Sequence, residues 1–256
     1  MKKYFPNDSK KLLAKFRFDS EIDKQFFKRV YSTPPWIYEN RLSLLKIKNK
    51  NNVLDAGCGF GQWTLALSNL NKNIHAIDAD RKKVTIAKSI LQLNEKNNIS
   101  YKVGSIERLP FNNKVFDAII CYSVIYRTDF KKSIKEFYRV LKPDGIVYVV
   151  ANGLGWYLYN LITGHSSAKD FNSRIHSLET ISASIEYYLT GKKKNRNGNI
   201  ILSPKSLARY MRIVGFREVI NAEEGHIQFN ENIKKHPFYP KKYLGLTNVF
   251  EIWAKK

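Results

Sequence analysis

Hydrophobic residues along the middle of this chain follow two alternating patterns. Short, almost continuous apolar runs are bounded by Asn, Asp and Gly, and between them apolar residues recur every three or four positions. The short runs are typical of buried strands, and the longer stretches are typical of amphipathic helices. This alternation indicates a parallel sheet with helices on both faces. We expect strands at 52–56, 73–78, 99–104, 115–121 and 145–151, and helices at 61–70, 80–95 and 129–141.

The residues before this alternation, 1–47, predict two or three short helices. Ser20 is placed to cap a helix from Glu21 to Tyr31, because serine side chains accept hydrogen bonds from the first amides of a helix. The sequence Thr33-Pro34-Pro35 is typical of the start of another helix. That helix would carry four apolar side chains on one face, namely Trp36, Tyr38, Leu42 and Leu45.

The alternation breaks at residues 152–200, which predict a helical insertion. An aromatic segment at 153–159 opens it, and a helix is expected at about 177–189. Ser203 and Pro204 then predict the start of a further helix. Two late strands, at 216–222 and 247–254, are expected to form an antiparallel edge hairpin joined by a long irregular segment.

These elements predict one α/β domain over residues 1–256. Its centre would be a doubly wound, mostly parallel, Rossmann-like sheet. Residues 1–47 would form an N-terminal helical cap, and residues 152–200 a helical insertion on the substrate side. The length and the 43% of hydrophobic residues are sufficient for a sizeable core.

Composition adds two expectations about the environment of the protein. No apolar run approaches the roughly 20 residues that span a bilayer, and residues 1–20 lack the apolar region of a signal peptide. Cys58 and Cys121 both lie in apolar surroundings and are expected to be small core residues rather than a disulfide or a metal pair. We therefore expect a cytoplasmic protein without a transmembrane segment or a metal.

The net charge of +22 has two interpretations. It favours anionic partners, such as nucleic acid, phosphorylated metabolites or an anionic membrane surface. The basic residues are, however, spread along the chain, and Lys and Asn are abundant together, as base composition alone can produce. Only Lys192-Lys193-Lys194-Asn195-Arg196 forms a real cluster. Nucleic acid is thus a compatible partner that the sequence does not favour.

The candidate chemistry begins at Val53-Leu54-Asp55-Ala56-Gly57-Cys58-Gly59-Phe60-Gly61. A strand that ends in this glycine-rich turn and leads into a helix is a cofactor-binding arrangement, because the backbone approaches a ligand closely and the helix start presents free amides. A nicotinamide enzyme would have its third glycine one position later than Gly61. Asp78 ends the next strand, where a carboxylate binds ribose hydroxyls in several nucleotide-binding folds.

Four segments together resemble the class I S-adenosylmethionine (SAM)-dependent methyltransferases, in the small-molecule branch similar to ubiquinone/menaquinone-type enzymes. "VLDAGCGFG" is similar to the first motif of that family and "IHAIDAD" to its second-strand motif. "GSIERLPFNNKVFDAIICYSVIY" resembles the stretch from the third to the fourth strand. "EFYRVLKPDGIVYVV" resembles the segment leading through the fifth strand, with Asp144 where glycine is usual.

The resemblance implies a set of cofactor-binding residues. Gly57, Cys58 and Gly59 would line the methionine part of SAM, and Asp55 would help to position it. Asp78 would bind the ribose hydroxyls, with Ala79 beside the adenine. Ser105 and Ile106 would contact the adenine, and the backbone at Cys121 and Tyr122 would meet the methionine amino group. After reaction the bound product would be S-adenosylhomocysteine.

The acceptor side is less defined by the sequence. The resemblance places Tyr126 and Arg127 after the fourth strand, where a tyrosine can orient an acceptor hydroxyl and an arginine can bind a phosphate or carboxylate. Packing of Tyr126 and pairing of Arg127 with Asp129 explain them equally well. The residues that we select as candidate bases or acceptor contacts are His165, His176, Tyr157 and His226.

These features favour a SAM-dependent methyltransferase that acts on a small, anionic acceptor. We expect O-methylation of a sugar, a nucleotide-sugar or another cell-envelope precursor. An RNA- or protein-directed methyltransferase, a lipid or quinone methyltransferase and a SAM-binding protein without catalysis stay open. The sequence around Cys121 lacks the motifs of DNA amino- and cytosine-methyltransferases. It does not indicate the oligomeric state.

Overall fold

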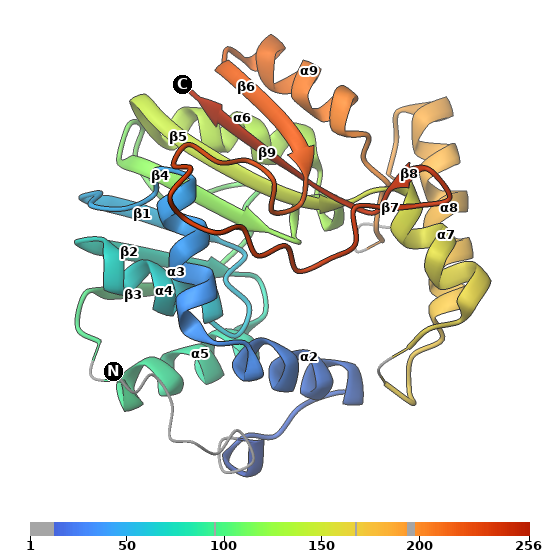
Figure 1. Ribbon diagram of the computed structural model, residues 1–256, viewed down its shortest axis with the longest axis horizontal. Helices are drawn as coiled ribbons and strands as arrows, with labels where there is room; N and C mark the ends of the chain where they lie inside the picture. The colour runs from blue at the N-terminus through green and yellow to red at the C-terminus, as the bar shows by residue number, and fades with distance from the viewer. Residues whose placement is uncertain (1–12, 95, 167, 194–197) are drawn as a thin grey trace.

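The central sheet is mostly parallel, as predicted. The computed structural model describes residues 13–94, 96–166, 168–193 and 198–256. Seven strands lie in the order β3–β2–β1–β4–β5–β9–β6, and β9 alone runs against its neighbours (Figure 1). The strands are β1 Asn52–Ala56, β2 Asn73–Asp78, β3 Ile99–Val103, β4 Phe116–Tyr122, β5 Leu141–Asn152, β6 Arg217–Glu223 and β9 Val249–Lys255.

The helices begin close to where their capping residues predict. Ser20 accepts a hydrogen bond from the amide of Asp23, and Ser203 one from the amide of Ser206. Asp80 and Asp129 cap two further helices through the amides that follow them. The helices are α2 Glu21–Ser32, α3 Pro35–Leu44, α4 Gln62–Leu70, α5 Arg81–Leu93, α6 Phe130–Val140, α7 Leu154–Thr163, α8 Ser173–Thr190 and α9 Pro204–Val214, with the 3₁₀ turn η1 at Ile125–Arg127.

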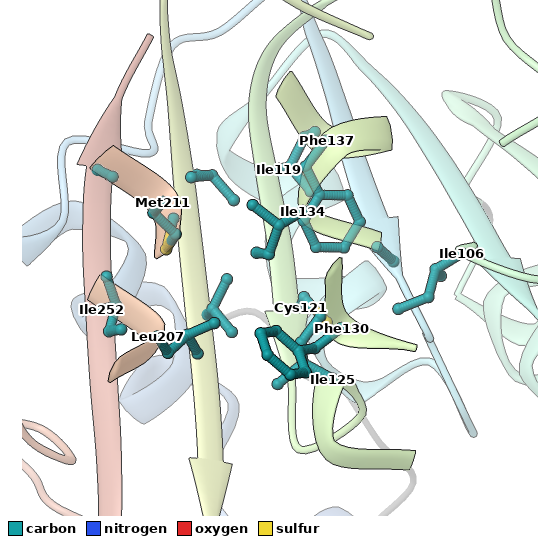
Figure 2. Close-up of a cluster of buried hydrophobic side chains, with 14 of the residues drawn as sticks. Ile106, Ile119, Cys121, Ile125, Phe130, Ile134, Phe137, Leu207, Met211 and Ile252 are labelled. Carbon is teal, nitrogen blue, oxygen red and sulfur yellow. The ribbon is translucent and has the colours of Figure 1, made fainter. Parts of the chain in front are cut away.

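Alternating side chains of the central strands bury both faces of the sheet. Ile119 and Cys121 of β4 point into a cluster with Phe137 of α6 and Met211 of α9 (Figure 2). Their neighbour Ile120 points to the opposite face, into a second cluster that includes side chains of α3 and α4. Because successive strand residues face opposite sides, the apolar runs of β4, β5 and β9 supply both clusters.

Two local expectations are corrected. The fifth strand was expected at 145–151, but β5 begins at Leu141, which pairs with Phe116 of β4. The register then shifts before the regular pairing from Ile146, and Asp144 in this interval adopts a left-handed backbone angle, φ +61°. Aspartate tolerates this conformation better than most residues. Trp36 does not share the buried face of α3: its side chain is 47% exposed and lies edge-on to His236.

The insertion forms a helical hairpin of α7 and α8 at one side of the sheet (Figure 1). The long segment before β9 contains a small antiparallel pair, β7 Lys242–Tyr243 and β8 Leu246–Thr247. No helix in the described ranges is long and apolar enough to cross a membrane. The first part of the predicted N-terminal cap, 1–12, and Lys194-Asn195-Arg196 of the basic cluster lie outside the described residues.

Candidate functional site

The glycine-rich turn after β1 has one closed side and one open side. Gly57 and Gly59 adopt positive φ angles of 85° and 52°. A Cβ atom at Gly57 would lie 2.4 Å from a methyl group of Val124, so this position has no room for a side chain. A Cβ atom at Gly59 would meet nothing within 4 Å. The turn therefore packs against the residues that follow β4 at Gly57 and leaves open space beside Gly59.

Asp78 fixes this turn from the end of β2. Its half-buried carboxylate accepts hydrogen bonds from the amides of Gly59, at 2.8 Å, and Asp80, at 2.9 Å. Ala79 beside it is exposed. A carboxylate has about four acceptor sites, so Asp78 keeps acceptor capacity for a ligand next to the open space at Gly59.

Asp55 is a second carboxyl group below the same turn. It is buried within β1 and accepts a 2.6 Å hydrogen bond from the hydroxyl of Thr64. Burial raises the pKa of Asp55 to about 7, and the nearby charge of Asp78 acts in the same direction. The side chain is therefore a hydrogen-bonding group whose charge changes near neutral pH.

Helix α2 covers the glycine-rich turn. The hydroxyl of Tyr31 donates to the carbonyl of Phe60 at 2.5 Å, and the rings of Phe27 and Phe60 lie 5.4 Å apart in an edge-to-face arrangement. The sequence predicted the helix but not this contact, because nothing in the local pattern of residues 21–31 indicates which distant loop they cover.

After β3 and β4, the residues predicted to contact the cofactor offer their backbone groups more than their side chains. Ile106 and Cys121 point into the buried cluster beneath the sheet (Figure 2). Ser105 is exposed, and its hydroxyl accepts from the amide of Glu107 at 3.1 Å. The phenol of Tyr122 donates to Glu224 at 3.0 Å. A ligand at this edge would meet the peptide groups of these residues.

Arg127 lies between the cofactor side and the insertion. Its guanidinium is 6.0 Å from the ring centre of Tyr126. The neighbouring Tyr126 is the main cause that raises the pKa of Arg127, and Tyr157 and Asp78 act in the same direction. The structure thus brings Tyr126, Arg127 and Tyr157 together near Asp78.

The predicted alternative for Arg127, an ion pair with Asp129, does not occur in the part of the chain that the structure describes. Asp129 instead accepts from the amides of Lys131 and Lys132 at the start of α6. Its carboxylate lies 3.6 Å from the ammonium group of Lys132. The guanidinium of Arg127 is therefore not committed to this carboxylate.

His176 of α8 joins the same group of residues. Its ring centre lies 6.4 Å from that of Tyr157, and its Nε2 lies 3.0 Å from the side-chain nitrogen of Asn199. Burial lowers the pKa of His176, and the charge of Arg127 lowers it further. The imidazole is therefore neutral at neutral pH and able to accept a proton.

Tyr157 carries a buried hydroxyl without a hydrogen-bond partner within 3.5 Å among the described residues. Asn152 and Asn199 lie near it. Burial raises the pKa of this phenol, with a further contribution from Tyr126. A buried polar atom without a partner is rare in folded proteins, and at a candidate site it indicates a position that a ligand can complete.

Two other predicted residues make different contacts. His165 is exposed beyond the end of α7, with its ring 6.0 Å from that of Tyr159. The Nδ1 atom of His226 lies 3.0 Å from the carbonyl oxygen of Glu224 and 3.2 Å from that of Glu223. Within the described ranges, neither histidine has a hydrogen bond or ring contact with Arg127, Tyr157 or His176.

A buried charged network behind the site was not predicted. Arg41 of α3 donates to Glu224 at 2.7 Å and to Glu251 at 3.3 Å, and both carboxylates are almost completely buried. Glu224 also accepts from Tyr122, and Glu251 from Tyr148 at 2.6 Å. The network therefore connects α3 and the end of β6 to Tyr122, the last residue of β4. No local sequence signal pairs residues so far apart.

Residues 54–149 match the family described as "Methyltransferase domain". The demethylmenaquinone methyltransferase of Lactococcus lactis is 34% identical over 39% of this chain and 41% of its own length. The ubiquinone biosynthesis O-methyltransferase of Pelagibacter ubique is 28% identical over 62% of this chain and 70% of its own.

A solved SAM-dependent methyltransferase from Aquifex aeolicus superposes on 87% of this chain and 98% of its own, with a TM-score of 0.51 and 15% identity. At that identity the likeness concerns the fold. The chain spans about half the length of the first curated relatives it matches.

Proposed function

We propose that residues 54–149, which match the family described as "Methyltransferase domain", form a SAM-dependent methyltransferase domain, and that this chain transfers the methyl group of SAM to an oxygen of a small acceptor that carries a phosphate or carboxylate. The observation that supports the acceptor class is the position of Arg127. Its guanidinium lies near both Asp78 and Tyr157 and is not paired with Asp129. It is therefore placed to bind an anionic group next to the cofactor.

The geometry fits the predicted cofactor residues. The open space at Gly59 admits the methionine part of SAM, with the buried carboxyl of Asp55 below it. Asp78 has acceptor capacity for ribose hydroxyls, and Ala79 is exposed for contact with the base. The peptide groups of Ser105, Ile106, Cys121 and Tyr122 complete the proposed site. The bound cofactor supplies an electrophilic methyl carbon.

The chain's own residues would orient the acceptor and remove its proton. Arg127 binds the anionic group, and the buried hydroxyl of Tyr157 donates a hydrogen bond to the acceptor. His176, neutral because burial and Arg127 lower its pKa, would accept the proton of the acceptor hydroxyl, while SAM would supply the methyl group and leave as S-adenosylhomocysteine. Phosphate-bearing sugars and other cell-envelope precursors carry both the anionic group and the hydroxyl that this arrangement requires.

A quinone acceptor is the second candidate. It is supported by the names of the Lactococcus and Pelagibacter relatives, which act in menaquinone and ubiquinone biosynthesis. A hydroxylated quinone has no phosphate, so its methylation would depend less on Arg127 than on Tyr157 and His176.

The test has two stages. Isothermal titration measures SAM and S-adenosylhomocysteine binding, and no binding of either would exclude the proposed cofactor. Transfer of a labelled methyl group is then compared between a nucleoside diphosphate sugar and a hydroxylated benzoquinone, for the native chain, Arg127→Gln and the control Arg209→Gln on the exposed side of α9. The anionic acceptor is supported if the native chain and Arg209→Gln methylate the sugar nucleotide and Arg127→Gln does not. Transfer to the quinone alone, unchanged in Arg127→Gln, replaces it.

A further inference from the structure

Helix α8 has polar residues on its buried side and apolar residues on its exposed side, the reverse of an ordinary surface helix. Four small polar residues face the protein, and they are Ser173, Ser177, Thr180 and Ser184. Leu178 and Ile185 face outward with 55% and 57% of their side chains exposed. Ile175 and Leu189 extend the same side, because spacings of three, seven and four residues return to one face of a helix.

Helix α7, which packs against α8, carries further exposed apolar side chains. Leu154 and Ile162 are exposed on it. Together the hairpin carries seven of the fourteen large apolar side chains that are exposed among the described residues. We call these seven residues the outer face of the hairpin: Leu154, Ile162, Ile175, Leu178, Ile185, Tyr188 and Leu189. Such a concentration on a surface marks an interaction site more often than chance exposure.

The positive net charge of the protein favours an anionic partner over a second copy of the chain. A second copy would bring another +22 charges to the contact, and this repulsion disfavours self-association. An anionic partner is attracted instead. Exposed Lys169 and Arg174 lie at the start of α8 and exposed Lys192 lies just after its end. Glu179 and half-buried Glu186 border the apolar side, three or four residues from Ile175 and Leu189, so the attraction to an anionic partner comes from these basic residues and from the net charge of the protein. Apolar side chains with basic residues at both ends of a helix fit a bilayer surface with anionic headgroups.

We propose that the outer face of the hairpin docks on an anionic membrane surface, with its apolar side chains in the headgroup region and the chain otherwise in water. The opposite side of α8 carries His176, which faces Tyr157. Docking would therefore place the proposed acceptor site beside the headgroups, within reach of an acceptor that resides in the membrane. The docking itself does not depend on methyl transfer.

The experiment measures binding of the full chain to vesicles of phosphatidylcholine alone and of phosphatidylcholine mixed with phosphatidylglycerol. The test variant is Leu178→Ser with Ile185→Ser. The matched control is Leu93→Ser with Ile213→Ser, which removes two apolar side chains that are 54% and 71% exposed on α5 and α9. SAM titration of each variant confirms that the fold and the cofactor site persist.

We expect binding to the phosphatidylglycerol vesicles that weakens with added salt and falls at least about tenfold in the test variant, because two side chains lose their apolar contact with the bilayer. The control variant should bind like the native chain. Absence of vesicle binding overturns the proposal, and so does equal binding by the test variant, which would mean adsorption by charge alone. A concentration-dependent dimer in sedimentation velocity that only the test variant abolishes would assign the outer face to a second copy instead.

Discussion

The backbone amide of Glu21 donates a 2.8 Å hydrogen bond to the carboxylate of Asp170, 149 residues further along the chain. Glu21 begins α2, which covers the glycine-rich turn, and Asp170 lies in the connection between α7 and α8, which carry Tyr157 and His176 (Figure 1). The two segments that cover the proposed cofactor and acceptor positions therefore meet at this bond. A carboxylate at a helix start is favourable, because the first amides of a helix lack partners within it.

Replacing Asp170 with alanine should loosen this contact without unfolding the protein. The bond is exposed, so we expect little change in thermal stability, while the Glu21 amide exchanges about fivefold faster with solvent. Hydrogen exchange measured on peptides from α2 and from residues 164–172 checks this result. Lys169→Ala, at the exposed neighbouring position, is the control. Unchanged exchange in Asp170→Ala would show that α2 and the insertion are held together by other contacts.

Asp78→Asn should weaken SAM binding. The amide keeps the size of the side chain but loses its charge and one of its acceptor oxygens, so the hydrogen bonds to Gly59, Asp80 and the ribose cannot all form. We expect the Kd for SAM to rise about tenfold or more by titration calorimetry. Asp80→Asn is the control, because Asp80 caps α5 through the amides of Lys82 and Lys83. Equal losses of SAM affinity in both variants would contradict the proposed role of Asp78 in binding the ribose.

Asp55→Asn should change how stability depends on pH. The folded-state pKa of about 7 lies above the ordinary value of 3.8, so the folded state holds the Asp55 proton more tightly than the unfolded state. The resulting stabilisation is complete below about pH 4 and is lost as the pH rises through 7, by up to about 4 kcal/mol. Asparagine is neutral throughout, so urea unfolding should show the variant gaining stability relative to the native chain as the pH rises from 5 to about 8.

Asp117→Asn should change the pH dependence of stability in the opposite direction. Although burial opposes it, hydrogen bonds from Lys142 and the amide of Asn52 lower the pKa of Asp117, so its ionised form stabilises the fold above its ordinary pKa. This variant should lose stability at neutral pH and approach the native chain in acid. If the two variants show the same pH dependence, the assignment of the buried proton to Asp55 is wrong.

Asn199→Asp should raise the pKa of His176. A carboxylate 3.0 Å from Nε2 would stabilise the protonated imidazole, whereas the present side chain carries no charge. If His176 accepts the proton of the acceptor, the rising limb of kcat/KM against pH should move upward by about one unit or more. Asn199→Leu separates this effect from packing, because it removes the hydrogen bond without adding charge. A uniform fall in rate with no shift of the pH profile would contradict a role for His176 as the base.

Arg41→Met should destabilise the whole fold. It leaves Glu224 and Glu251 buried without their cation, a situation that typically costs about 3–5 kcal/mol. Urea unfolding at neutral pH measures the loss. Arg209→Met, at an exposed position on α9, should change the stability by no more than about 0.5 kcal/mol. A loss below about 1 kcal/mol in Arg41→Met would mean that the two carboxylates find other partners or are already protonated.

The strands and helices of the methyltransferase core could be predicted because each carries its own signal. The run Val53 to Ala56 is apolar except at Asp55, as is typical of a strand buried on both faces, and Asp80 and Asp129 mark the starts of α5 and α6. The positions of the glycine turn and of Asp78 at the end of β2 were predicted the same way, because they depend on local backbone geometry, while their roles toward a cofactor stay predictions. The early start of β5 at Leu141 was missed because Lys142-Pro143-Asp144-Gly145 has the composition of a turn; these residues lie in the irregularity between the Leu141–Phe116 pair and the regular pairing with β4 from Ile146.

The sequence by itself determined the class of fold, the methyltransferase motifs and the residues at the ends of β1 and β2, because these depend on neighbours within a few positions. Only the tertiary structure decided which distant residues meet: Arg41 with Glu224 and Glu251, and His176 with Asn199. It placed the carboxylate of Asp129 beside Lys132 rather than Arg127. It also decided that the apolar residues of α8 face outward. These contacts join segments far apart in the chain, and their partners are fixed by the packing of whole helices against the sheet, which no local pattern encodes.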